Sequence, residues 1–185
     1  SHVRALSALG RNLPSSQLVA VTRLMITVGE FATAWHLLRD ALQASPSADL
    51  LVAIGEQMLM LERYPDALAC LLAAERQGFR HPMLSFLLSS TYRFLGDLPC
   101  AIAAAEDTLQ LQPNFAHAHW ALSQLGCRDN AGQRIDRVRQ SIRALERRSD
   151  VSSPQIQSGL SMLWHALFRE MDTLEDRAAA WTCLE

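Results

Sequence analysis

The chain has 185 residues, of which 49% are hydrophobic, and this apolar content is sufficient for one large or two small globular domains. Its 17 basic and 19 acidic residues give a formal net charge of -2, so the overall charge gives no reason to expect binding to nucleic acid or to an anionic membrane. All the basic residues are arginine. The chain therefore lacks the amine that a Walker-type phosphate loop, a Schiff base or a lysine general base requires.

The four cysteines, Cys70, Cys100, Cys127 and Cys183, lie far apart and form no CxxC pair and no zinc-finger spacing with histidine. We therefore expect a reduced, cytoplasmic chain with no metal or other cofactor. No apolar run reaches the roughly 18 to 20 residues that span a bilayer. The first ten residues also lack the uninterrupted hydrophobic region of a signal peptide, so we expect no membrane partner.

The first two predicted elements are a short helix and a helical hairpin. Residues 1–14 carry an apolar helical face that ends at Gly10 and Pro14, which predicts the end of a preceding repeat or a capping helix. Residues 15–48 predict two helices that are separated by a turn at Gly29, with Pro46 closing the unit.

The same helical hairpin is predicted twice more, in residues 48–81 and 82–115. Ala34, Ala67 and Ala101 mark equivalent positions of the three units, at separations of 33 and 34 residues. Small residues at a fixed period indicate places where two helices cross closely, because large side chains of one helix fill the space that the small ones leave. The repetition predicts a solenoid of helix pairs.

The fourth unit, residues 116–150, begins regularly but then departs from the pattern in a polar turn over residues 127–133. A second helix is predicted from about Ala131, with a narrow apolar stripe and many arginines on the remaining surface. We interpret these arginines as a solvated face, and binding of phosphate or RNA is the alternative. Residues 151–185 predict a fifth, truncated unit, in which Ser153 is the N-cap and Pro154 the first helical residue.

The spacing of large and small residues resembles the tetratricopeptide repeat (TPR) family, closely in residues 15–115 and less closely afterwards. The resemblance implies an all-α fold, a right-handed α-α superhelix of antiparallel helix pairs. The first helices of such pairs line a concave groove that accepts an extended peptide or a partner helix.

The resemblance also implies which residues face the groove, namely the second, fifth, ninth and twelfth of each first helix. Arginine can bind a carboxylate through paired hydrogen bonds, and aromatic side chains are typical anchors of a bound partner. Ordinary packing or solvation is the alternative for each residue. The candidate groove residues are Arg23, Glu56, Phe86, Ser90, Arg93, His117, Trp120 and Gln124.

A metal site at His117 and His119 is not expected, because residues two apart on a helix point to different sides.

The repeats and the groove that they imply predict a protein–protein interaction scaffold that binds a protein or peptide ligand and is not itself an enzyme. A fused C-terminal domain, or self-association through the truncated end, is a further alternative for its partners.

A narrower resemblance concerns the end of the chain, where the arginine-rich segment RIDRVRQSIRAL is followed by HALFREMDTLEDRAAAWTCLE. These segments resemble the TPR region that precedes the sulfotransferase domain in certain bacterial fusion proteins. This resemblance implies a non-catalytic N-terminal region that recruits or positions the acceptor, with the catalytic domain outside this chain.

Overall fold

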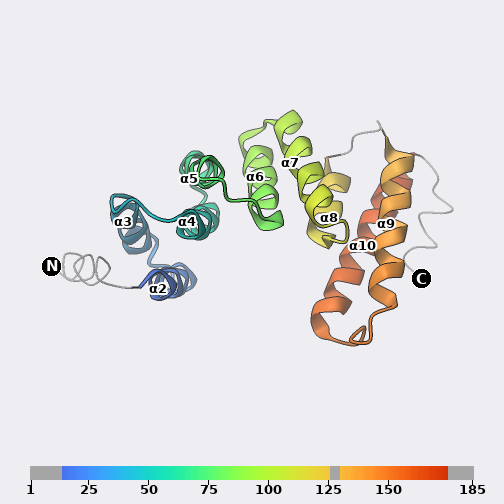
Figure 1. The fold of residues 1–185 in the computed structure, drawn as a ribbon, viewed down its shortest axis with the longest axis horizontal. Helices are drawn as coiled ribbons and strands as arrows, with labels where there is room; N and C mark the ends of the chain where they lie inside the picture. Colours follow the sequence, from blue (N-terminus) through green and yellow to red (C-terminus); the bar gives the residue numbers. More distant parts are fainter. Residues whose placement is uncertain (1–13, 126–129, 175–185) are drawn as a thin grey trace. The chain divides into compact units, whose positions relative to one another are not determined.

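The computed structural model describes residues 14–125 and 130–174, and the secondary structure of this part of the chain is helical throughout. The expected all-α class is therefore confirmed. The chain divides into two compact units, residues 1–80 with 94–96 and residues 81–93 with 97–185, and we describe each by itself (Figure 1). No helix of the described residues is long and apolar enough to cross a membrane.

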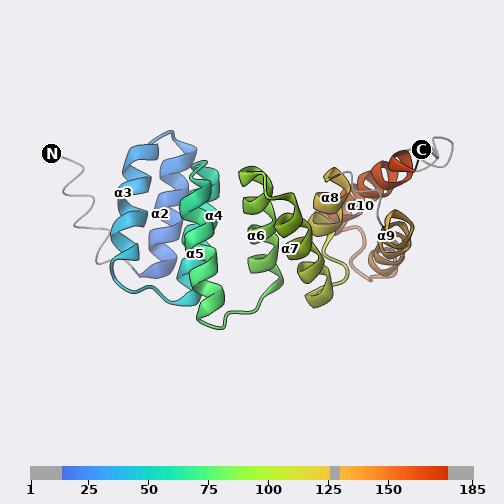
Figure 2. The ribbon, with the colours of Figure 1, turned by 90° about the horizontal axis from the view of Figure 1, so that it is seen from above.

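The first unit contains two antiparallel helical hairpins (Figure 2). They are formed by α2 (Ser15–Thr27) with α3 (Phe31–Leu42), and by α4 (Ala48–Met60) with α5 (Tyr64–Arg76). The turn between α2 and α3 passes through Gly29 at φ 85°, a left-handed conformation that glycine adopts without steric cost.

Two small residues determine how closely α4 approaches α5. A Cβ atom placed on Gly55 would lie 2.8 Å from Cδ2 of Leu71 and 3.5 Å from the carbonyl oxygen of Ala67. Ala67 is completely buried at this crossing. Any larger side chain on either residue would push the two helices apart, since protein interiors are close-packed.

The second unit continues with α6 (Pro82–Leu95), whose last residues belong to the first unit, and α7 (Leu98–Leu111). The same close crossing recurs here, because Ser89 on α6 donates a hydrogen bond from Oγ to the carbonyl oxygen of fully buried Ala101 at 2.8 Å. The hairpin turn again uses a left-handed glycine, Gly96 at φ 81°.

The rest of the second unit departs from the hairpin pattern. It contains α8 (Ala116–Gln124), α9 (Ala131–Glu146) and α10 (Pro154–Thr173), and α10 packs against both α8 and α9. The predicted N-cap of α10 is confirmed, since the backbone N–H of Ile156 donates to Ser153 Oγ at 3.4 Å. The core that these three helices share contains the apolar stripe of α9: Ala116, Ile135, Val138, Ile142, Leu160, Leu163, Leu167 and Met171.

The interpretation of the α9 arginines as a solvated face is wrong for Arg134. Its Nε and Nη2 donate to the two carboxylate oxygens of Glu170 on α10 at 2.7 and 2.9 Å. The two side chains are only 8% and 2% exposed. Arg137, which is partly buried, likewise donates from Nη1 and Nη2 to both oxygens of Glu106 on α7. In a helical pattern arginine counts only as a polar residue. The pattern therefore cannot predict that Arg134 is buried in the core and paired with a carboxylate 36 residues away.

Some predictions fall on residues that the structure does not describe. These are the helix in residues 1–13, the part of the polar turn in residues 127–129, and the second helix of the fifth unit in residues 175–185. The division into units at residues 15, 48, 82, 116 and 151 stays a prediction, although the described helix pairs lie within these bounds.

Candidate functional site

In the first unit the structure brings the two predicted groove residues together. Arg23 on α2 donates from Nη2 to Oε2 of Glu56 on α4 at 3.3 Å. Their side chains remain 53% and 44% exposed, so the pair is solvated. The equivalent positions of neighbouring hairpins are thus adjacent on the surface, as the repeat predicts.

In the second unit the predicted residues gather on α6 and α8. The ring of Phe86 on α6 lies 5.7 Å from the ring of His117 on α8, between centroids, in an edge-to-face arrangement. Helical spacing places the remaining predicted residues of each helix on the same faces as these two. We call this set the α6–α8 stripe: Phe86, Ser90, Arg93, His117, Trp120 and Gln124.

The α6–α8 stripe presents aromatic surface to solvent. Trp120 is 36% exposed, and His117 is also exposed, whereas Phe86 is half-buried against Phe115 at 5.4 Å. A large aromatic side chain on the surface, on the same helix face as the partly buried Phe86–His117 contact, provides the kind of anchor that contributes most to protein binding.

The two histidines of α8 point to different sides, as predicted. His117 is exposed, whereas His119 is 2% exposed and its Nε2 lies 2.8 Å from the carbonyl oxygen of Pro113 and 3.1 Å from Ser141 Oγ. Burial lowers the pKa of the His119 imidazole, and the charge of nearby Arg137 also lowers it, although the Pro113 carbonyl and Glu106 act in the opposite direction. Within the described residues, no group of three or more His, Cys, Asp or Glu could hold a metal ion.

We expect His119 to make the stability of the chain depend on pH. Because the folded-state pKa is lower than the unfolded value of about 6.5, the unfolded chain binds more protons between the two. The stabilisation is therefore complete above about pH 6.5 and is lost as the pH falls toward the folded-state pKa. Each pH unit in this window contributes at most about 1.4 kcal/mol.

Urea unfolding at pH 7.5 and pH 5.5 tests this expectation for the wild-type chain and for His119→Gln. The glutamine amide can still donate to the Pro113 carbonyl but does not titrate. The loss of stability between the two pH values should be smaller in the variant. An equal loss in both chains would show that other groups cause it.

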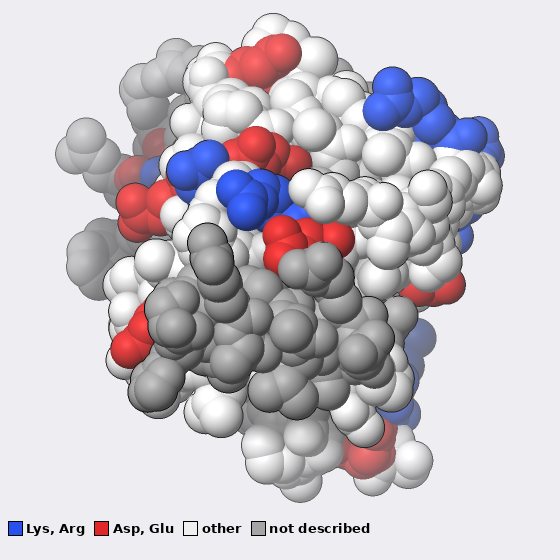
Figure 3. Space-filling model, turned by 90° about the vertical axis from the view of Figure 1, so that its left-hand side faces the viewer, with Lys and Arg blue, Asp and Glu red and all other residues white. Residues whose placement is uncertain are grey.

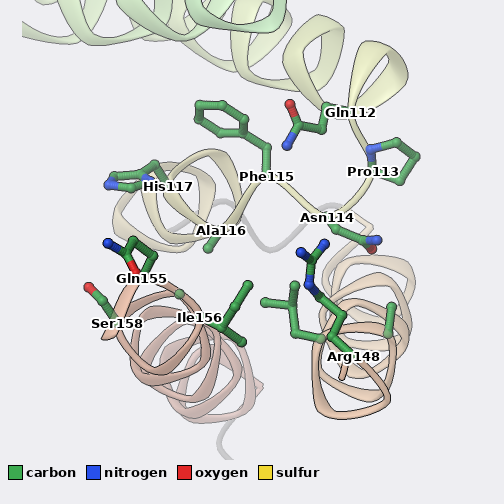
Figure 4. Close-up of a pocket in the computed structure, with 13 residues that line it drawn as sticks. Gln112, Pro113, Asn114, Phe115, Ala116, His117, Arg148, Gln155, Ile156 and Ser158 are labelled. Atoms are coloured by element: carbon green, nitrogen blue, oxygen red, sulfur yellow. The ribbon is translucent and has the colours of Figure 1, made fainter. Parts of the chain in front are cut away.

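A pocket of about 470 Å³ lies beside the α6–α8 stripe in the second unit, and sequence reasoning missed it (Figure 4). Three separate segments line it, so no periodic pattern in the sequence could have predicted it. They are the connection from α7 into α8, the end of α9 and the first turns of α10. The lining residues are Gln112, Pro113, Asn114, Phe115, Ala116, His117, Ala144, Leu145, Arg148, Gln155, Ile156, Ser158 and Gly159.

On the described part of the face that Figure 3 shows, acidic and basic side chains lie next to each other near the middle, and a further group of basic side chains lies at one edge. On α9, Arg134 and Arg137 bind carboxylates of other helices, and Arg139 Nη1 lies 4.0 Å from Asp136 Oδ1. These contacts favour a structural role for Arg134 and Arg137, for which binding of phosphate or RNA was the alternative in the sequence.

Repeated antiparallel helix pairs with a close crossing of small residues define an all-α helical repeat of the TPR kind. No family model matches the chain, and no curated protein matches it. Solved structures do match. The chain is 16% identical to a Podospora anserina protein of kinesin light chain type with nearly identical TPR-like repeats, which it matches with a TM-score of 0.71 over 94% of this chain and 93% of that one.

Two further structures have the same fold. MamA is matched with a TM-score of 0.66 at 16% identity over 92% of this chain and 87% of that one. YrrB, a TPR protein with an unusual peptide-binding site, is matched with a TM-score of 0.57 at 16% identity over 89% of both chains. At this identity the likeness shows the TPR fold alone. It gives no support to the resemblance to a region that precedes a sulfotransferase domain.

Proposed function

We propose that this chain is a protein–protein interaction scaffold that binds an extended peptide or a partner helix on the α6–α8 stripe. The observation that carries the proposal is the exposed Trp120 next to the Phe86–His117 contact. These residues lie on α6 and α8, the first helices of two successive predicted repeats. Aromatic residues and arginine contribute most of the binding energy at protein interfaces, and the stripe contains both.

Two other features support a peptide ligand. YrrB, which has the same fold, is described by its peptide-binding site. The exposed Arg23–Glu56 pair offers one charge of each sign, and we propose it as a separate polar contact point of the first unit by itself. The charges attract each other only weakly in water, so a ligand could replace that contact at little cost.

Replacing Trp120 and Arg93 together by alanine should weaken ligand binding while leaving the fold intact. The probe is a set of twelve-residue peptides that are selected from a random phage-displayed library for binding to the wild-type chain. Loss of a central aromatic anchor costs about 2 kcal/mol or more, so we expect the dissociation constant to rise about 30-fold. Isothermal titration calorimetry measures the affinity, and circular dichroism confirms the helix content.

Trp164 provides a matched control, because it is the same residue type on α10 with 37% exposure and lies outside the α6–α8 stripe. Arg76 at the end of α5 is an exposed arginine that is also outside the stripe. Peptide affinity should be unchanged in the double variant Trp164→Ala, Arg76→Ala. If this control variant loses affinity and the Trp120→Ala, Arg93→Ala variant does not, the binding surface lies elsewhere.

A further inference from the structure

The pocket of the second unit has a lining that is unlike the aromatic surface of the stripe. Its polar groups are mainly side-chain amides, those of Gln112, Asn114 and Gln155. Among the described residues, none of these three side chains forms a hydrogen bond, and all three are exposed. Each amide can donate and accept at the same time, which is the requirement for pairing with a peptide group.

The charge of the pocket is compensated. Arg148 is the only arginine or acidic residue in the lining, and its Nε and Nη2 donate to the carboxylate of Asp150 at 2.8 and 2.9 Å. The guanidinium of Arg148 points from the end of α9 into the pocket (Figure 4). Arg23 makes only one contact of 3.3 Å with Glu56, whereas an anionic ligand of Arg148 would have to break two shorter bonds to Asp150. The Nη1 donors of Arg148 can still bind a neutral carbonyl oxygen.

The pocket lining also contains apolar side chains, which alternate with the amides. Phe115, Leu145 and Ile156 are half-buried around it, so each leaves part of its side chain for a ligand to cover. The lining residue Gly159, near the start of α10, has no side chain. A Cβ atom there would lie 3.6 Å from Cδ1 of Leu145 and 3.9 Å from Cβ of Ala116. An apolar side chain of a ligand would gain burial here.

The pocket is continuous with the α6–α8 stripe through one residue. His117 lines the pocket and also contacts Phe86 of the stripe at 5.7 Å between ring centroids. A ligand that lies along the stripe can therefore extend into the pocket without leaving the surface of the second unit.

We propose that the pocket binds an uncharged, extended peptide segment, whose backbone pairs with the side-chain amides and whose apolar side chain covers Phe115, Leu145 and Ile156. This deepens the proposed function and rests on it, since the segment is the continuation of the ligand on the stripe. The pocket selects an uncharged sequence because its one cation is already neutralised by Asp150.

The test is an NMR titration of the whole ¹⁵N-labelled chain with the blocked tripeptide acetyl-Ser-Leu-Ser-amide. The backbone amides of Ala116, Leu145 and Gly159 should shift and saturate at millimolar tripeptide, as expected for a small ligand. The charged tripeptide acetyl-Ser-Glu-Ser-amide should bind at least about tenfold more weakly. No saturable shift with the leucine tripeptide, or equal or tighter binding of the glutamate tripeptide, would overturn the proposal.

Gly159 offers a pair of variants that differ only in size. Gly159→Ala adds a methyl group at ordinary contact distance from Leu145, so tripeptide affinity should change by less than about threefold. Gly159→Leu should fill the pocket and weaken binding at least about tenfold. If the leucine variant fails to fold, Asn114→Leu decides instead, because this exposed residue can be replaced without disturbing the core. Unchanged affinity in the deciding variant would overturn the proposal.

The variant Trp120→Ala, Arg93→Ala separates this inference from the proposed function. The tripeptide is too short to reach the stripe and should bind this variant as it binds the wild-type chain. If library peptides lose affinity in this variant while the leucine tripeptide binds no form of the chain, the stripe is the binding surface and the pocket is not. If the tripeptide binds and library peptides are unaffected, the pocket is a ligand site and the stripe is not.

Discussion

Replacing Arg134 by methionine should lower the free energy of unfolding by about 3–5 kcal/mol. The two side chains are 8% and 2% exposed and are joined by two hydrogen bonds of 2.7 and 2.9 Å. Removing the guanidinium leaves the Glu170 carboxylate buried without this counter-charge, and the cost of burying an unpaired ion is far larger than the attraction that is lost. Urea unfolding of the Arg134→Met variant at pH 7.5 measures the effect.

The double variant Arg134→Met, Glu170→Met separates this explanation from simple loss of packing. With both charges removed, two flexible apolar side chains of suitable size fill the space, and most of the stability should return, to within about 1 kcal/mol of the wild-type chain. Arg139→Met is the surface control. Its contact with Asp136 is 4.0 Å long and both side chains are well exposed, so its effect should stay within about 0.5 kcal/mol. An Arg134→Met variant that behaves like this control would show that the Arg134–Glu170 pair is solvated.

The sequence was a good guide to the fold wherever local spacing determines it. The glycine turns at Gly29 and Gly96, the N-cap at Ser153 and the restart of a helix at Ala131 all follow from residues that are close in the chain. Each is also a local conformational preference, so one sequence is sufficient to recognise it. The period of 33 to 34 residues also predicts which helices pair. The small residue at the same place in each repeat must pack against the corresponding helix of that repeat.

The second half of the chain was less predictable because its contacts join residues far apart. α10 packs on α8 as well as on α9, and the residues that meet there have no common period. The pocket and the Arg134–Glu170 pair both result from this irregular packing. The candidate groove residues stay a prediction, although some of them contact one another. The Phe86–His117 and Arg23–Glu56 contacts occur at the expected positions, but whether a ligand binds there stays a prediction.

Leucine in place of Ala67 or Ala101 should destabilise the chain by about 1–3 kcal/mol. Both alanines are completely buried at a helix crossing, the first opposite Gly55 and the second beside Ser89. Three additional carbon atoms cannot be accommodated there in a relaxed rotamer, so the helices must separate and the hydrogen bond of Ser89 to Ala101 must lengthen. Thermal unfolding followed by circular dichroism measures the loss.

The exposed alanines of the same helices provide the controls. Ala69→Leu on α5 and Ala103→Leu on α7 add the same atoms to solvent-facing positions, and stability should change by less than about 0.5 kcal/mol. Because Ala67 and Ala101 are 34 residues apart, we expect similar losses at both core positions. A large loss at only one would show that the crossing is not a repeated feature, and unchanged stability at both would contradict the register that relates the hairpins. The comparison therefore tests whether the crossing is equally close in the two hairpins.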